Sequence, residues 1–222
     1  MGMGVKERKQ MAKRAAAEIR SGMIVNLGIG IPSFVPDFLP KHIHVMFQAE
    51  NGLVGMGPSP KKGEEDGNLC NAGGLPVTVV PGASYSDSTL SFGMIRRGRV
   101  DMSILGALQV SEKGDLANWI VPGKKVPGMG GAMELAQKAK KVIVLMSHTD
   151  KKGRAKILQS CTLPLTSQSC VDMIITEMAV FQVEKEGLVL SEIVEGYTIE
   201  EIKWITDCPF IVKGDLTVIS KL

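Results

Sequence analysis

The sequence predicts a three-layer α/β protein in which a mainly parallel mixed sheet is covered by helices on both faces. Continuous apolar runs at residues 100–106 and 141–146 are typical of strands buried on both sides. Segments of helical pattern at residues 88–97 and 133–140 alternate with such runs, which indicates right-handed crossovers between parallel strands. Without an internal repeat or a low-complexity linker, we expect one domain over residues 1–222, with a sheet of about six or seven strands.

The N-terminal segment predicts an amphipathic helix over residues 6–21. Met11, Ala15 and Ile19 recur at spacing four, with charged residues on the other face and Gly22 as a stop. The elements expected next are a strand at 23–27, a glycine turn at 28–32, a helix from Pro32 and a strand at 42–47.

Residues 52–74 are rich in Gly, Pro, Asn and charge without a clear period, so we expect a surface excursion there. Later strands are expected at 77–80, 102–107, 142–146, 173–181 and 188–192. The tail carries the sequence Thr198-Ile199-Glu200-Glu201, which is a capping box and predicts a helix over residues 198–206.

Composition excludes several classes of protein. The net charge is only +3 and Lys and Arg are scattered, so nucleic-acid binding is not expected. The four cysteines lie far apart without a C-x-x-C pair, which argues against a zinc site and fits reduced thiols in the cytoplasm. No apolar stretch approaches the roughly 20 residues of a membrane helix, and the N-terminus has no signal-peptide pattern.

Glu50 is the most informative single residue. It stands in Gln48-Ala49-Glu50-Asn51-Gly52, a run that directly follows the strand expected at residues 42–47. Ligands of open α/β sheets bind outside the carboxyl ends of the strands, so a functional carboxylate belongs at this place. The alternative is that Glu-Asn-Gly forms only a solvated turn.

A glycine-rich loop is the second feature that could carry chemistry. Residues 127–135 read Pro-Gly-Met-Gly-Gly-Ala-Met-Glu-Leu and run into an expected helix. Glycines let backbone N–H groups crowd onto a ligand, and a helix N-terminus adds partial positive charge, so this loop could form an oxyanion hole. The alternative is a helix-entry turn whose glycines serve close packing.

Other catalytic motifs are missing from the sequence. There is no G-x-S-x-G, no Walker pattern, no complete dinucleotide fingerprint and no cluster of metal-ligand residues. A carboxylate opposite an oxyanion hole indicates covalent catalysis. Because carboxylates are weak nucleophiles, a thioester is the activated substrate that suits them, which favours coenzyme A transfer.

Together these features resemble the β subunit of the family I CoA transferases, the 3-oxoacid, acetate and acetoacetate enzymes. The similarity covers nearly the whole chain and is carried by nine short runs in the family's order. They are NLGIGIP (26–32), ENGL (50–53), PGAS (81–84), MIR (94–96), GDLANW (114–119), PGK (122–124), GMGGAM (128–133), TLPL (162–165) and AVF (179–181).

The resemblance implies that Glu50 is the nucleophile and that the Gly131 amide holds the thioester oxygen. It implies ping-pong transfer of CoA from an acyl-CoA to a carboxylic acid, expected to be an oxo acid, through a glutamyl-CoA thioester and without a metal or redox cofactor. A partner α subunit, in an α₂β₂ assembly, would complete the site. The residues that it places at the substrate and CoA are Gly28, Gly30, Asn51, Gly52, Lys124, Gly130 and Ala132.

The chain departs from the family pattern at several positions. Ala49 replaces the usual Ser before the glutamate, and Gly74 and Leu75 replace a Lys-Glu pair. Arg97 and Arg99 replace Gly and His. These changes suggest an acceptor acid unlike the usual small oxoacids. The alternative for Gly74 and Leu75 is neutral drift at the rim of a loop. Two other functions stay open, a non-catalytic ligand-binding relative of the same fold and an acyl-CoA hydrolase.

Overall fold

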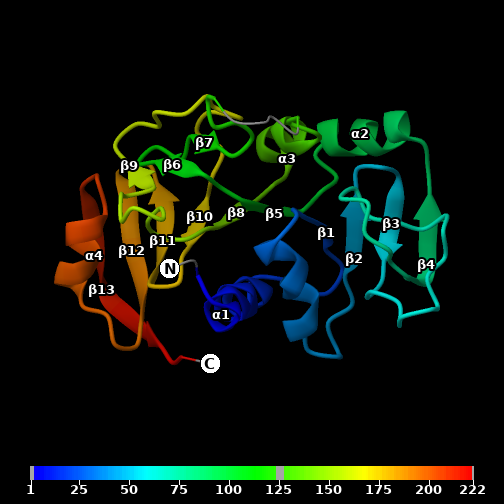
Figure 1. Ribbon diagram of the computed structural model, residues 1–222, viewed down its shortest axis with the longest axis horizontal. Coiled ribbons are helices and arrows are strands. Elements are labelled where there is room, and N and C mark those ends of the chain that lie inside the picture. The colour runs from blue at the N-terminus through cyan, green and yellow to red at the C-terminus, as the bar shows by residue number, and fades with distance from the viewer. Residues whose placement is uncertain (1–2, 124–127, 222) are drawn as a thin grey trace.

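A ten-stranded mixed sheet runs through the computed structural model, which describes residues 3–123 and 128–221 (Figure 1). The strand order is β13-β12-β11-β10-β8-β5-β1-β2-β3-β4. The strands from β10 to β2 in this order run parallel to one another, and antiparallel pairings flank them on both sides. The parallel strands are β10 (Met173–Ile175), β8 (Val142–Leu145), β5 (Met102–Gly106), β1 (Ile24–Leu27) and β2 (Met46–Ala49).

Both faces of the sheet are covered, as predicted. One face packs against α1 (Val5–Ala16) and the 3₁₀ helix η1 (Ile31–Phe38). The other face carries the remaining helices and a small sheet of order β7-β6-β9 (Figure 1). These elements are α2 (Ser88–Arg96), α3 (Ala132–Lys138), α4 (Ile199–Ile205), β6 (Gln109–Ser111), β7 (Leu116–Ala117) and β9 (Ile157–Leu158).

Strand β8 explains why the central runs are continuously apolar. Val142 and Val144 point into the core beneath the small sheet, whereas Ile143 and Leu145 point into the core beneath α1. All four side chains are buried, so no position of this strand faces water. The expectation of strands buried on both faces is confirmed here.

The sheet is larger than the six or seven strands expected, for three reasons. β3 (Leu53–Met56) was not expected, because it lies inside the segment predicted to be irregular, and it pairs with β4 (Val79–Tyr85), near the strand expected at 77–80. The run 173–181 is two antiparallel strands, β10 and β11 (Ala179–Glu184), because the Thr176 hydroxyl accepts from the amides of Met178 and Ala179 and closes a turn. β13 (Phe210–Ile219) is the third addition, and it pairs with β12 (Gly187–Val194), which was expected at 188–192.

Two expected helices differ from their predicted form. α1 ends at Ala16 rather than at residue 21, although Ile19 in the following turn is still buried. The segment opened by Pro32 is a 3₁₀ helix, and it contains Pro36 as well, which removes a second amide donor. The capping box of α4 is confirmed, since Thr198 and Glu201 each bond to the other's backbone amide.

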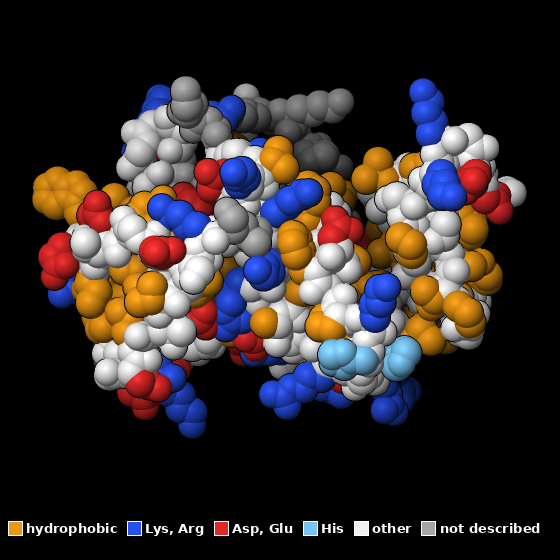
Figure 2. All heavy atoms as spheres, turned by 90° about the horizontal axis from the view of Figure 1, so that it is seen from below, with side chains coloured by type: hydrophobic (Ala, Val, Ile, Leu, Met, Phe, Trp, Pro, Cys, Tyr) orange, Lys and Arg blue, Asp and Glu red, His pale blue; other side chains and the backbone are white. Residues whose placement is uncertain are grey.

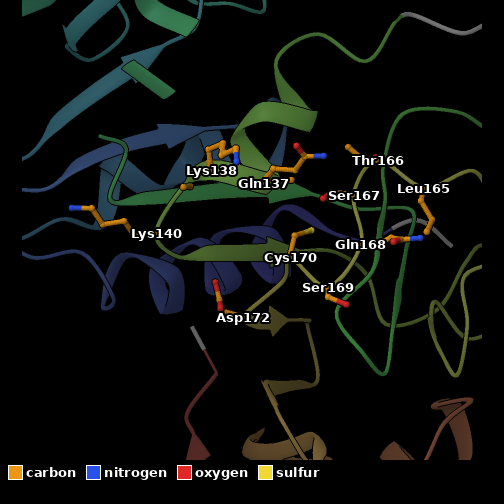
Figure 3. Close-up of a pocket in the computed structure, with 12 residues that line it drawn as sticks. Gln137, Lys138, Lys140, Leu165, Thr166, Ser167, Gln168, Ser169, Cys170 and Asp172 are labelled. Carbon is orange, nitrogen blue, oxygen red and sulfur yellow. The ribbon is translucent and has the colours of Figure 1, made fainter. Parts of the chain in front are cut away.

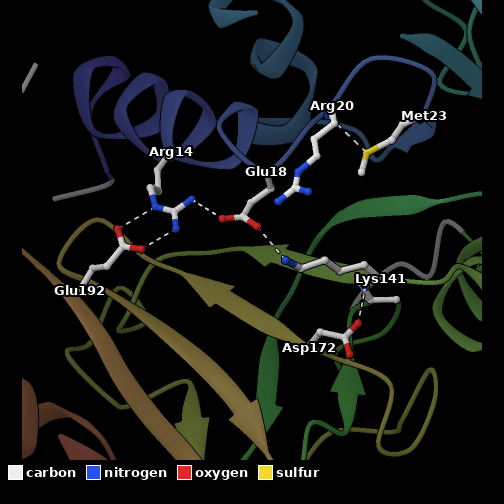
Figure 4. A network of polar contacts seen from close by, with 8 residues as sticks. Arg14, Glu18, Arg20, Met23, Lys141, Asp172 and Glu192 are labelled. Carbon is white, nitrogen blue, oxygen red and sulfur yellow. Dashed lines mark hydrogen bonds and ion pairs between the residues drawn. The ribbon is translucent and has the colours of Figure 1, made fainter. Parts of the chain in front are cut away.

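An ionic network fastens α1 to the sheet (Figure 4). Arg14 pairs with Glu192 on β12 and with Glu18, and Lys141 at the start of β8 pairs with Glu18 at 2.7 Å. The hydrogen bond to Glu192 raises the pKa of Arg14 above its ordinary value. Burial opposes ionisation of Glu18, but the bonds from Lys141 and Arg14 outweigh it and hold the pKa of that carboxyl below its usual range.

On the face seen in Figure 2, basic side chains lie among acidic and hydrophobic ones rather than in one continuous patch. Among the described helices, none is both long and apolar enough to cross a membrane.

Candidate active site

Glu50 directly follows β2, at the edge of the sheet where the parallel strands have their carboxyl ends. The Gly52 amide donates to the Ala49 carbonyl at 3.0 Å, so Glu-Asn-Gly is indeed a tight turn. Gly52 has a φ of 120°, and a Cβ at this position would lie 1.9 Å from the Ser86 carbonyl oxygen. Only glycine therefore fits, and the turn fixes where the Glu50 side chain starts.

Gly131 packs directly against the Glu50 side chain. A Cβ on Gly131 would lie 3.1 Å from Glu50 Cγ and 3.3 Å from Glu50 Oε1. Gly131 is the N-cap of α3, with a φ of −82°, so it is the space beside Glu50 rather than backbone strain that favours glycine here. Among the described residues, no backbone carbonyl accepts a hydrogen bond from the Gly131 amide. The two residues selected from the sequence thus lie together.

Asn26 on β1 is a third member of the site and was missed from the sequence. Its Nδ2 lies 3.3 Å from Glu50 Oε2, and its side chain is only 1% exposed. A lone amide inside the apolar strand Ile24–Leu27 is a visible signal, because a buried polar side chain needs a partner. The two carboxylate oxygens of Glu50 therefore differ: Oε2 receives the Asn26 amide, whereas Oε1 lies beside Gly131.

The loops after β1 and β2 meet the loop at residues 70–75 at this edge. Asn51 Nδ2 donates to the Cys70 carbonyl at 2.8 Å. A Cβ on Gly73 would lie 3.1 Å from Ile29 Cδ1, which places the Gly28–Gly30 turn against the same loop. The Gly28 amide is bonded to the Ile104 carbonyl at 2.8 Å, so it holds the turn to β5.

The remaining predicted residues lie on the glycine loop. Gly130, with a φ of 55°, precedes Gly131, and Ala132 is the first residue of α3. Both therefore lie next to the Glu50–Gly131 contact. Lys124 lies outside the described residues.

Two of the unusual arginines are not at the site. Arg97 ends α2, and Arg99 follows Gly98, where a Cβ would lie 3.7 Å from the Lys138 carbonyl oxygen at the far end of α3. The chain then enters β5 at its amino end, which is the edge of the sheet opposite Glu50. By contrast, Gly74 and Leu75 belong to the 70–75 loop that contacts Asn51.

One groove of the described structure lies away from Glu50. It has a volume of about 670 Å³ and is lined by the C-terminal end of α3 and by residues 165–172 (Figure 3). Gly131 is at the other end of α3, so this groove is separate from the glutamate site. Among the described residues, no three His, Cys, Asp or Glu side chains are grouped to hold a metal ion.

Comparison with known proteins identifies the family. The sequence profile described as Coenzyme A transferase matches residues 8–204. A Bacillus subtilis (strain 168) protein described as a probable coenzyme A transferase subunit beta is 66% identical over 207 residues, which are 93% of this chain and 95% of that protein. The acetate CoA-transferase subunit beta of Escherichia coli (strain K12) is 48% identical over 209 residues, which are 94% of this chain and 95% of that protein.

Solved structures agree on the fold. An acyl-CoA transferase from Escherichia coli O157:H7 superposes with a TM-score of 0.76 at 21% identity, over 99% of this chain and 44% of that one. The chain thus spans less than half the length of that single-chain relative. The fold is of the α/β class, and the chain belongs to the coenzyme A transferase family. The resemblance inferred from the sequence is confirmed.

Proposed function

We propose that this chain supplies the nucleophilic glutamate of an enzyme that moves coenzyme A from an acyl-CoA to a carboxylic acid. The observation that carries the proposal is the packing of Gly131 against Glu50, with 3.3 Å between Glu50 Oε1 and the position of a Cβ. A carboxylate and a backbone amide at a helix N-terminus are the two groups that attack on a thioester requires.

In the first half-reaction, a Glu50 carboxylate oxygen attacks the carbonyl carbon of the acyl-CoA. Charge develops on the thioester oxygen, towards which the Gly131 N–H would donate. The C–S bond breaks, CoA leaves as a thiolate and an acyl-glutamyl anhydride remains. The thiolate then attacks the glutamyl carbonyl, which releases the donor acid and leaves a glutamyl-CoA thioester.

The second half-reaction runs the same steps in reverse. The carboxylate of the acceptor acid attacks the glutamyl thioester and expels the CoA thiolate. This thiolate attacks the acceptor's acyl carbon, so that a new acyl-CoA forms and the Glu50 carboxylate is regenerated. The exchange balances in atoms and electrons without a metal or a redox cofactor.

The hydrogen bond that Asn26 donates to Glu50 suits this sequence of steps. A hydrogen bond to Oε2 holds the Glu50 side chain in place and leaves Oε1 as the attacking oxygen on the side of Gly131. An oriented reacting group lowers the entropic part of the barrier, and a misplacement of about 1 Å can cost roughly 10²-fold in rate.

We also propose a partner subunit. Relatives of nearly the same length are named subunit beta, and a single-chain relative is more than twice as long. A separate α chain that supplies the other half accounts for both facts, and we propose that the two chains assemble as α₂β₂. Co-expression with the partner is therefore part of each activity test.

The acceptor is proposed to be a monocarboxylic acid with an uncharged chain, larger than the usual small oxoacids. The 70–75 loop next to Asn51 reads Cys-Asn-Ala-Gly-Gly-Leu and carries no basic residue. Ile29 and Leu75 at this rim are 72% and 54% exposed, so they offer apolar contacts to a bound acyl chain. Larger uncharged acids should then be used better than acetoacetate or succinate, and a preference for acetoacetate would contradict this assignment.

The test is CoA transfer by the complex of both subunits, followed as CoA thioesters by chromatography. Glu50→Gln should lower kcat by at least about 10³-fold, because the nucleophile is lost. Glu195→Gln, at an exposed turn after β12, is the matched control and should keep wild-type activity. Release of free thiol without any acid acceptor would instead indicate a hydrolase, and the absence of both reactions would indicate a ligand-binding relative.

A further inference from the structure

A chain of buried polar side chains lies behind Glu50. Gln48 on β2 is 1% exposed and Ser91 on α2 is 4% exposed. Gln48 Oε1 accepts from Asn26 Nδ2 at 2.8 Å, and Gln48 Nε2 donates to Ser91 Oγ at 2.9 Å. Ser91 Oγ in turn lies 3.4 Å from the Ala49 carbonyl, directly before Glu50. The polar chain therefore connects α2, β2 and β1 with the carboxylate.

These contacts leave each amide one favourable orientation. Gln48 has its donor on Ser91 and its acceptor on Asn26. Asn26 Nδ2 faces three acceptors: the Gln48 carbonyl, Gln48 Oε1 and Glu50 Oε2. A reversed Asn26 amide would bring its oxygen against all three. Gln48 thus fixes Asn26, and Asn26 fixes Glu50 Oε2.

The buried polar residues at this level of the sheet, on β1, β2 and β5, are not arranged for stability alone. Asn26 Oδ1 and Ser103 Oγ, on register-paired residues of β1 and β5, are buried and have no hydrogen-bond partner among the described residues. Buried polar groups without partners cost free energy, so an apolar layer would stabilise the sheet at least as well. A requirement other than stability explains why amides are used here.

We propose that Gln48 is a positioning residue, which sets the orientation of Glu50 through Asn26 without touching substrate. The inference rests on the proposed function, because it assigns Gln48 a role in the attack by Glu50. Its side chain is buried beneath the site, so it acts on the rate of the covalent step rather than on binding.

The first variant is Gln48→Met, which keeps the length of the side chain and removes both hydrogen bonds. In the complex of both subunits, we expect kcat to fall roughly 10- to 100-fold, as for a misplaced reacting group, while KM changes by less than about twofold. The Glu50 adduct should form more slowly by the same factor in single turnover. Ser103→Ala is the matched control in the same layer and should keep the wild-type rate.

The second variant, Gln48→Glu, separates positioning from a merely structural role. A protonated carboxyl can still accept from Asn26 and donate to Ser91, whereas an ionised one cannot donate and repels Glu50. Asn26 on β1, Val54 on β3 and Ser91 on α2 carry no charge, and Glu50, which shares the Asn26 amide, is the charged neighbour. Activity relative to wild type should therefore be close to normal at low pH and fall as pH rises.

Four results would overturn the inference. A wild-type kcat in Gln48→Met, or an equal loss in Ser103→Ala, would make Gln48 ordinary packing. A pH profile of Gln48→Glu parallel to that of wild type would contradict the role of its hydrogen bonds. If the wild-type complex forms no adduct at Glu50, the proposed function is contradicted, and the positioning role of Gln48 with it. If adduct formation is slow only in the Gln48 variants, the result supports the proposed function and the positioning role.

Discussion

Glu50 and Gly131 come from loops far apart in the sequence, yet a Cβ on Gly131 would lie 3.1 Å from Glu50 Cγ. Glu50 directly follows β2, and Gly131 is the N-cap of α3. The space beside the Glu50 carboxylate therefore exists because residue 131 is a glycine and has no side chain. Several consequences of this arrangement can be measured.

Gly131→Ala should impair activity without unfolding the protein. The added methyl would push the Glu50 side chain away from its position, and a shift of this kind can lower kcat by roughly 10²-fold. The φ of −82° suits alanine, so the midpoint of urea unfolding should stay near that of wild type. Gly93→Ala within α2, where a Cβ has no neighbour within 4 Å, is the control and should be fully active.

Gly52→Ala should impair both stability and activity. The new Cβ would meet the Ser86 carbonyl at 1.9 Å, at a φ of 120° that alanine avoids. We expect a loss of roughly 2–4 kcal/mol in the free energy of unfolding, from strain and clash together. Gly63→Ala has a similar φ of 90° but open space around it, so it should lose only about 1 kcal/mol. Equal losses in the two variants would mean that the contact with Ser86 is unimportant.

The parts of the site that were predictable are those in which one short sequence motif, read by itself, points to a functional residue. Glu50 and the Gly131 loop stand out in the sequence, and their place at the carboxyl edge follows from the parallel sheet. Asn26 and Gln48 were harder to find, because their role depends on which strands are neighbours. Sequence periodicity does not reveal that β1 lies beside β2.

The fold class was predictable from β5 and β8, whose apolar runs require cover on both faces. Two strands at the sides of the sheet, β3 and β13, were not. β3 has only four residues, and β13 is a half-exposed edge strand that lacks a continuous apolar pattern. From the sequence, Arg97 and Arg99 were expected to influence the choice of acceptor acid. The direction of α2 instead places them at the edge of the sheet opposite Glu50.

Arg14→Met should destabilise the protein and leave its catalytic step intact. The variant leaves Glu192, 14% exposed, and Glu18, 20% exposed, without their shared cation (Figure 4). Breaking such a partly buried network costs roughly 2–4 kcal/mol. Arg154→Met removes an exposed pair with Asp150 and should change the free energy of unfolding by less than about 1 kcal/mol. A smaller effect of Arg14→Met than of Arg154→Met in urea unfolding would contradict this account.

His148 should make stability depend on pH in the acid range. Burial, with a smaller effect of the Lys156 charge, lowers the pKa of this imidazole to about 4. Its ring nitrogens bond to the Thr176 and Thr206 hydroxyls at 3.1 and 2.9 Å. Because the unfolded histidine binds its proton near pH 6.5, stability should decrease as pH falls from about 6.5 to about 4, by roughly 3 kcal/mol.

His148→Gln removes this titration, so the difference between pH 7 and pH 4.5 in the free energy of unfolding should be smaller than in wild type. His42→Gln, at an exposed position, should keep the wild-type difference. An unchanged pH dependence in His148→Gln would show that another group is responsible.

The most direct test of the central claim is the intact mass of this chain after incubation of the two-subunit complex with a panel of acyl-CoAs. We expect a covalent CoA adduct that maps to Glu50, is discharged by an acceptor acid and is lost in Glu50→Gln. An assembled complex that turns over acyl-CoA without any adduct at Glu50, or with an adduct at another residue, would contradict the glutamyl-CoA mechanism.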